Sequence, residues 1–147
     1  MIVIWSTPKK FHLFSWLISK FLGAKYSHSA IVFKIEQTGQ FLVFQATRKG
    51  VYPIEYSKFK AKNHIIEYVE INQDHLEEYA LRYCIDHIGT QYDFLDVILI
   101  ALNIKYSNGE KRMICSELVA RAIGFNGHHL DQIDPKELKE LIKEIPC

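Results

Sequence analysis

Cys115 is the residue of this chain best placed for covalent chemistry. It stands at the start of a stretch that predicts a short helix, which Gly124 closes as a C-cap. A thiol in the first turn of a helix meets free backbone N–H groups and the positive end of the helix dipole. Both favour the thiolate and lower the pKa of the thiol. The position also suits a buried structural cysteine, because Cys115 shares a helical stripe with Leu118, Val119 and Ala122.

A cysteine nucleophile needs a base within hydrogen-bond reach, and His28 is the best candidate. It begins an expected strand, and its small or polar neighbours leave room for a partner side chain. The other six histidines lack such a setting. His128 and His129 adjoin Gly127 in an expected loop and show no ligand spacing typical of a zinc site, so we expect no metal and no cofactor.

Five stretches rich in β-branched and aromatic residues must position these side chains. The predicted strands cover residues 2–5, 28–35, 41–47, 51–55 and 64–71. Short turns join neighbouring stretches, which predicts an antiparallel sheet of four to six strands. Pro53 places its strand at a sheet edge.

Along the sequence, one helix is expected before the main run of strands at 28–71, and further helices are expected after it. Ser6 and Pro8 offer an N-cap and a first-turn proline for a helix that ends at Gly23. Its core-facing side chains should be Phe11, Phe14, Leu17, Ile18, Phe21 and Leu22. Trp16 falls on the opposite face, free to touch a substrate or a lipid surface, or simply exposed. Further helices are predicted over 73–88, over 93–102, from Cys115, and from a capping box at Asp134.

Composition restricts the choice of function. The 147 residues, 48% hydrophobic and 24% charged, fit a single α+β domain spanning 1–147. A net charge of +1 gives no reason to expect nucleic acid as a partner, and no apolar run is long enough for stable membrane insertion. The cysteines at 84, 115 and 147 form no CxxC pair, and we see no signal peptide. We therefore expect reduced thiols and a cytoplasmic protein, of open oligomeric state.

Several motifs together resemble one group of known proteins. They are Tyr26-Ser27-His28-Ser29-Ala30-Ile31-Val32, then Phe44-Gln45-Ala46-Thr47 with Gly50-Val51, then Gly89-Thr90-Gln91-Tyr92-Asp93-Phe94, and last Ile114-Cys115-Ser116-Glu117-Leu118-Val119. In this order the chain resembles the circularly permuted NlpC/P60 group of papain-like proteins, which includes the YiiX-like and the lecithin:retinol acyltransferase-like proteins. The resemblance implies a permuted papain-like fold, in which the histidine-bearing sheet precedes the cysteine-bearing helix.

The resemblance also implies roles for four residues. Cys115 would be the nucleophile and His28 the general base. Gln45 stands where YiiX-like relatives usually carry glutamate, and would orient His28. Tyr92 would help to form the oxyanion hole beside the backbone N–H of Cys115. The amide of Gln45 can accept a hydrogen bond from imidazole but supplies no charge, which predicts weaker activity.

The register of the sheet decides whether His28 and Gln45 can meet. A two-residue turn at Thr38-Gly39 would place His28 opposite Lys49 and leave Gln45 two pairs along the same face. A bulge or a longer loop is therefore needed to bring the two side chains together.

Two classes of function fit these observations. The first is a cysteine-dependent hydrolase or acyltransferase that acts on an amide or ester through a thioacyl intermediate, most readily an amidase or peptidase. Its substrate would be a small molecule, a peptide or a lipid acyl compound. The second is a binding or structural module that keeps the fold with little or no turnover.

Overall fold

The computed structural model describes residues 1–11, 13–93, 97–99, 112–127 and 130–145. Its elements in chain order are β1 (Ile2–Pro8), α1 (Leu13–Leu22), β2 (His28–Ile35), β3 (Gln40–Thr47), β4 (Gly50–Glu55), α2 (Tyr56–Lys62), β5 (Asn63–Glu70), α3 (Asp74–Asp86), β6 (Gln91–Tyr92), β7 (Arg112–Met113), α5 (Cys115–Ala122) and α6 (Pro135–Ile142). Five strands form an antiparallel sheet in the order β4-β3-β2-β1-β5. The predicted α+β class and antiparallel sheet are therefore confirmed.

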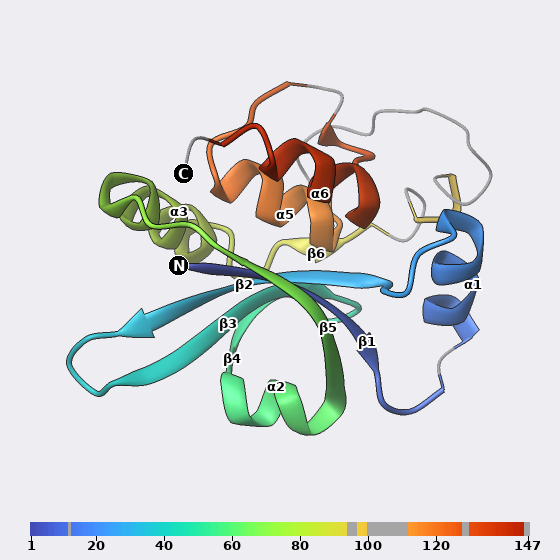
Figure 1. Ribbon diagram of the computed structural model, residues 1–147, viewed down its shortest axis with the longest axis horizontal. Coiled ribbons are helices and arrows are strands. Elements are labelled where there is room, and N and C mark those ends of the chain that lie inside the picture. The colour runs from blue at the N-terminus through green and yellow to red at the C-terminus, as the bar shows by residue number, and fades with distance from the viewer. Residues whose placement is uncertain (12, 94–96, 100–111, 128–129, 146–147) are drawn as a thin grey trace.

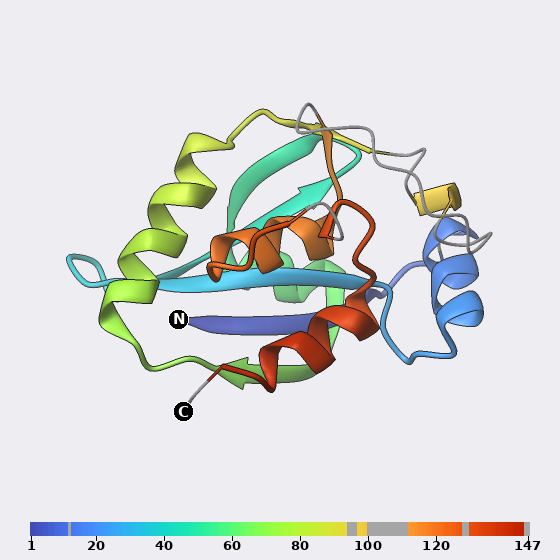
Figure 2. The ribbon, with the colours of Figure 1, turned by 90° about the horizontal axis from the view of Figure 1, so that it is seen from above.

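Helices cover both faces of this sheet (Figure 1). α3, α5 and α6 lie over one face, and α2 lies across the other. Successive side chains of a strand point to opposite faces, so each face of the sheet has its own core. The larger core lies under α5 and includes Trp5, Phe33 and Leu118, and the smaller one surrounds Phe59 of α2. Seen from above, α3 and α1 lie at opposite ends of the sheet (Figure 2).

The N-terminal helix begins later than the sequence predicts. β1 continues through Pro8, because residues 6–8 pair with residues 63–65 of β5. The expected N-cap and first-turn proline therefore lie in a strand, and α1 starts at Leu13. Strand pairing across the fold has outweighed the local capping signal. Phe11 precedes the helix and is 76% exposed, so its expected core position is wrong.

Some expectations fall on parts of the chain that the structure does not describe. These are the helix over 93–102 apart from residues 93 and 97–99, the pair His128-His129, Cys147, and the side chains of Phe14, Leu17, Phe21 and Leu22. Trp16 is 45% exposed, and the Lys20 ammonium lies 4.7 Å from the centre of its ring.

The short helix α2 is absent from the sequence prediction. It follows the edge strand β4, and the next strand, β5, pairs with β1 at the opposite edge of the sheet. Phe59 anchors the helix and is completely buried. Pro53 lies in β4 at the sheet edge, as predicted.

The C-terminal helix α6 begins with the predicted capping box. One carboxylate oxygen of Asp134 accepts the backbone N–H groups of Lys136 and Glu137 at 2.6 and 2.8 Å. The Glu137 carboxylate accepts the Asp134 N–H in return at 3.1 Å. The indole N–H of Trp5 donates to the Pro135 carbonyl at 2.9 Å, which ties the helix to β1.

A small parallel pair, β6 and β7, was not foreseen, and it joins the segment before α5 to the edge of the sheet. Tyr92 pairs with Met113, and the Val51 N–H of β4 donates to the Thr90 carbonyl at 2.9 Å. Gly50 has φ +89°, and a Cβ there would lie 2.6 Å from the Thr90 oxygen. Only glycine fits this close approach. In the described part of the chain, no helix is both long and apolar enough to cross a bilayer.

Candidate functional site

Cys115 is the first residue of α5 and lies beneath the surface. It is 5% exposed. Ile114 occupies the N-cap in an extended conformation, and its aliphatic side chain offers no capping oxygen. The Glu117 carboxyl instead bonds back to the Ile114 backbone, as in the second half of a capping box. The helix begins at the cysteine as predicted, and its N–H groups face the region around the sulfur.

His28 is the first residue of β2, and its ring forms a hydrogen bond with the Cys115 thiol. Burial by itself raises the pKa of a thiol and lowers the pKa of an imidazole. The opposite charges of the two groups and their shared hydrogen bond outweigh burial. The pKa of Cys115 is therefore lowered and the pKa of His28 is raised. This is the electrostatic signature of a thiolate–imidazolium pair.

Gln45 holds the other side of the His28 ring. Its Oε1 atom lies 3.1 Å from His28 Nε2, which leaves Nδ1 for the Cys115 sulfur. Gln45 is buried, and the His28 ring stacks on Phe59 with 6.3 Å between the ring centres. The imidazole is thus fixed by an acceptor on one edge and by an aromatic ring on its face.

A longer connection between β2 and β3 creates this contact. Four residues, 36–39, join the strands, and the described pairing ends at Ile31 with Phe44. If the same register continues, Thr47 is level with His28. Gln45 then lies two residues from Thr47, on the same face of the sheet as His28. Diagonal neighbours of this kind are within reach of long side chains. The predicted need for a longer loop is therefore confirmed, and no bulge is recorded between these strands.

Ser29 is a site residue that the sequence motifs did not single out. It is completely buried, and both its backbone and its hydroxyl form hydrogen bonds that lower the pKa of Cys115. Alternation along β2 offered the only signal, because it turns Ser29 toward the α5 side of the sheet.

Tyr92 reaches the same site from β6. Burial raises the pKa of its phenol well above the usual value, and the negative charges of Cys115 and Asp93 raise it further. The phenol therefore stays protonated near neutral pH, and its O–H remains a donor. The structure thus brings Tyr92, His28 and Gln45 together around Cys115, while their catalytic roles stay a prediction.

A cavity of about 570 Å³ opens beside these side chains. Its walls include His28, Gln45 and Tyr92. Cys115 itself is not on the wall, but two of its direct neighbours are, so the cavity is the approach to the sulfur from this side. Further walls come from α1, β4 and α2 through Leu13, Ile18, Ile54 and Phe59.

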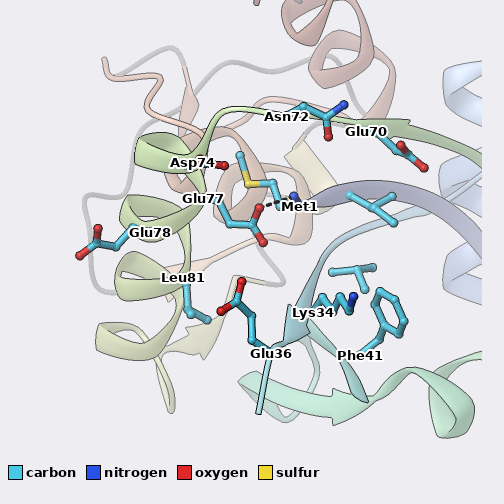
Figure 3. Close-up of a pocket in the computed structure, with 12 residues that line it drawn as sticks. Met1, Lys34, Glu36, Phe41, Glu70, Asn72, Asp74, Glu77, Glu78 and Leu81 are labelled. Carbon is cyan, nitrogen blue, oxygen red and sulfur yellow. Dashed lines mark hydrogen bonds and ion pairs between the residues drawn. The ribbon is translucent and has the colours of Figure 1, made fainter. Parts of the chain in front are cut away.

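A larger cavity lies at another end of the molecule, next to Met1 (Figure 3). It measures about 890 Å³, and its close-up shows the Glu77 carboxylate of α3 pointing at the chain's amino group, to which it bonds at 2.6 Å. None of the four predicted site residues lines it. Size alone therefore does not identify the functional cavity of this protein.

Two further buried groups lie outside the site. Burial raises the pKa of Cys84 in α3 to about 12, which makes this thiol an unreactive part of the core. Glu117 and Asp131 flank Arg121 at 2.8 and 2.6 Å in a buried network on the far side of α5's first turn. In the described part of the chain, no three histidine, cysteine or acidic residues gather as metal ligands would.

Comparison with known proteins does not assign this chain to a group. No protein-family model matches it, and no curated protein is significantly similar to it. We therefore infer the function of this protein from the geometry of its site.

Proposed function

We propose that the protein is a cysteine-dependent hydrolase or acyltransferase of the permuted papain-like kind, acting on an amide or ester. One observation carries the proposal. The Cys115 thiol, the His28 ring and the Gln45 amide form a continuous chain of hydrogen bonds at the start of a helix. The lowered pKa of Cys115 and the raised pKa of His28 are those that a cysteine nucleophile and its base require.

The acyl transfer proceeds in two steps in this proposal. The Cys115 thiolate attacks the substrate carbonyl carbon and forms a C–S bond. As the C–N or C–O bond breaks, the His28 imidazolium gives its proton to the leaving amine or alcohol. Water or an acceptor hydroxyl or amine then gives a proton back to His28 and attacks the thioacyl carbon, which breaks the C–S bond and restores the thiolate.

Two groups near the sulfur can donate a hydrogen bond to the negative oxygen that develops during each attack. The backbone N–H of Cys115 belongs to the first turn of α5, where it has no partner within the helix. The protonated phenol of Tyr92 lies near the same sulfur. Such fixed donors stabilise an oxyanion more than the neutral carbonyl from which it forms.

Labelling of single cysteines tests the proposal. We expect chloroacetamide to alkylate Cys115 well before Cys84 at neutral pH, with intact-mass and peptide analysis locating the adduct. His28→Ala should slow this labelling, and Cys115→Ser should abolish it at that peptide. A folded protein whose Cys115 reacts no faster than a free peptide thiol would overturn the proposal.

A second measurement separates an enzyme from a module without turnover. 4-Nitrophenyl acetate should acetylate Cys115 with release of one nitrophenolate, and the acetyl group should then be lost to water. Continuous turnover supports a hydrolase. A stable acetyl group that passes only to added amines or alcohols supports an acyltransferase. A stable acetyl group that passes to neither contradicts both forms of the proposal.

A further inference from the structure

The cavity beside the Cys115–His28 pair is cationic at its mouth. Arg48 and Lys49, in the turn between β3 and β4, and Lys62, at the end of α2, all line it with exposed side chains. No aspartate or glutamate stands among the described residues of this lining. The chain as a whole carries a net charge of only +1, so this bias is local.

The second cavity makes the contrast clear. Its described lining holds five carboxylates, those of Glu36, Glu70, Asp74, Glu77 and Glu78, beside two cations, Lys34 and the amino group of Met1 (Figure 3). Among the described residues, negative charges thus predominate in this cavity and positive charges in the other. An approach lined by one sign of charge attracts ligands of the other sign.

No carboxylate of the described residues forms an ion pair with the two lysines of the mouth. Lysines elsewhere pair with glutamates, as Lys58 does with Glu55 at 3.0 Å and Lys143 with Glu140 at 2.7 Å. Within the described residues, neither Lys49 nor Lys62 has an ion-pair partner of this kind. Their ammonium groups are therefore available to a ligand.

Apolar side chains make up another part of this lining. Ile18 of α1 and Ile54 of β4 are half-buried in it, and Phe59 of α2 is completely buried against the His28 ring. A ligand that fills the cavity therefore places an apolar segment on this wall and its polar end at the mouth.

We propose that this site takes acyl substrates that carry an anionic group, a carboxylate or a phosphate, joined by a short apolar segment to the carbonyl that Cys115 attacks. Lys49 and Lys62 receive the anion. The inference rests on the proposed function, because it specifies the substrate of the same site.

Three alkylating reagents that differ only in the charge of their tail test this inference. Each is a chloroacetamide with the same short alkyl linker, ending in a carboxylate, a phosphate monoester or an uncharged primary amide. In every case the Cys115 thiolate displaces chloride from the CH₂ carbon, and a C–S bond replaces the C–Cl bond. Intact-mass analysis gives the second-order rate for each reagent, and linkers of several lengths locate the best spacing.

We expect the anionic reagents to react faster than the uncharged one at low ionic strength. This preference should weaken as salt is raised, because the cations of the mouth are exposed. In Lys49→Glu and in Lys62→Glu the ratio of anionic to uncharged rates should fall, by up to about fivefold for each lysine replaced, the range typical of exposed charge pairs. Because the His28 imidazolium also attracts anions, the inference depends on this change in the ratio and not on the ratio itself.

Lys136→Glu is the matched control, since it makes the same charge change in α6 and does not line the cavity. It should keep the ratio of the unaltered protein. If a glutamate variant fails to fold, Lys49→Gln and Lys62→Gln replace it, with half the change in charge.

The outcomes separate this inference from the proposed function. If the uncharged reagent labels Cys115 no faster than a free thiol, the proposed function fails. If Cys115 is reactive but the ratio is equal in the unaltered protein and the lysine variants, only the anionic substrate class fails. A preference for the carboxylate tail or for the phosphate tail identifies which anion the mouth receives.

Discussion

The amide oxygen of Gln45 lies 3.1 Å from Nε2 of His28, on the side of the ring away from Cys115. An amide oxygen can accept only if the imidazole nitrogen carries a proton, so Gln45 selects the form of His28 that is protonated at Nε2. It contributes to the raised pKa of His28, behind the larger effect of Cys115. Gln45 thus orients the His28 ring without adding a second negative charge to the site.

Gln45→Glu should raise the pKa of His28 further. A carboxylate at this distance stabilises the imidazolium, and through it the Cys115 thiolate. NMR titration of His28 measures the change directly, and Gln45→Ala, which removes the acceptor, should lower the pKa of His28 instead. If the titration of His28 is the same in all three proteins, the contact between the two side chains does not govern the imidazole.

Ser29→Ala should raise the pKa of Cys115, because the variant loses a hydroxyl donor to the thiolate while the backbone bond remains. The pH dependence of iodoacetamide alkylation measures that pKa. Ser27→Ala is the matched control, since Ser27 is also a buried serine of this strand region but does not contribute to the lowered pKa of Cys115. Equal shifts in the two variants would contradict the assigned contact.

Gly50→Ala should destabilise the protein and reduce the reactivity of Cys115. The added methyl group would meet the Thr90 carbonyl at 2.6 Å from a residue at φ +89°. The expected loss of unfolding free energy is more than about 1 kcal/mol. Thermal melting and urea unfolding measure the loss, with Gly39→Ala as the control, since that glycine also has positive φ but open space around it. A larger loss in the control would contradict this account of Gly50.

Glu117 should make the stability of the protein depend on pH. Burial raises the pKa of its carboxyl to about 7, although Arg121 opposes this effect. The folded protein therefore holds a proton that the unfolded chain releases above its ordinary pKa of 4.5. The stabilisation is fully present below pH 4.5 and is lost as pH rises through 7.

Glu117→Gln should remove this dependence. The unfolding free energy of the unaltered protein, minus that of the variant, should fall between pH 4.5 and 7 by at most about 3 kcal/mol, at about 1.4 kcal/mol per pKa unit. Urea unfolding at several pH values measures it, with the exposed Glu78→Gln as control. A difference that rises with pH would show that the Arg121 ion pair dominates instead.

The sequence predicted elements whose signals are local. Alternating β-branched and aromatic residues placed all five strands of the sheet to within a few residues, and Asp134 with Glu137 marked the start of α6. The helix start predicted at Pro8 was wrong, because Pro8 lies in a strand that pairs with β5, and no local pattern reveals this pairing. The residues of the site also differed in whether a local signal marked them. Cys115 carried a helix-start signal, whereas the contribution of Ser29 depends on how α5 packs against β2.

The order in which the chain folds determines when the Cys115 thiolate can form. Ile2 pairs with Glu70, so the internal strand β1 gains its second neighbour only from a much later part of the chain. Sheets closed by such distant pairings fold over milliseconds to seconds, more slowly than helical bundles. α5 packs against β2 and β3, so His28 meets Cys115 only once this helix has docked on the sheet. During refolding the ordinary thiol should therefore persist until α5 docks, and the onset of fast alkylation reports that step.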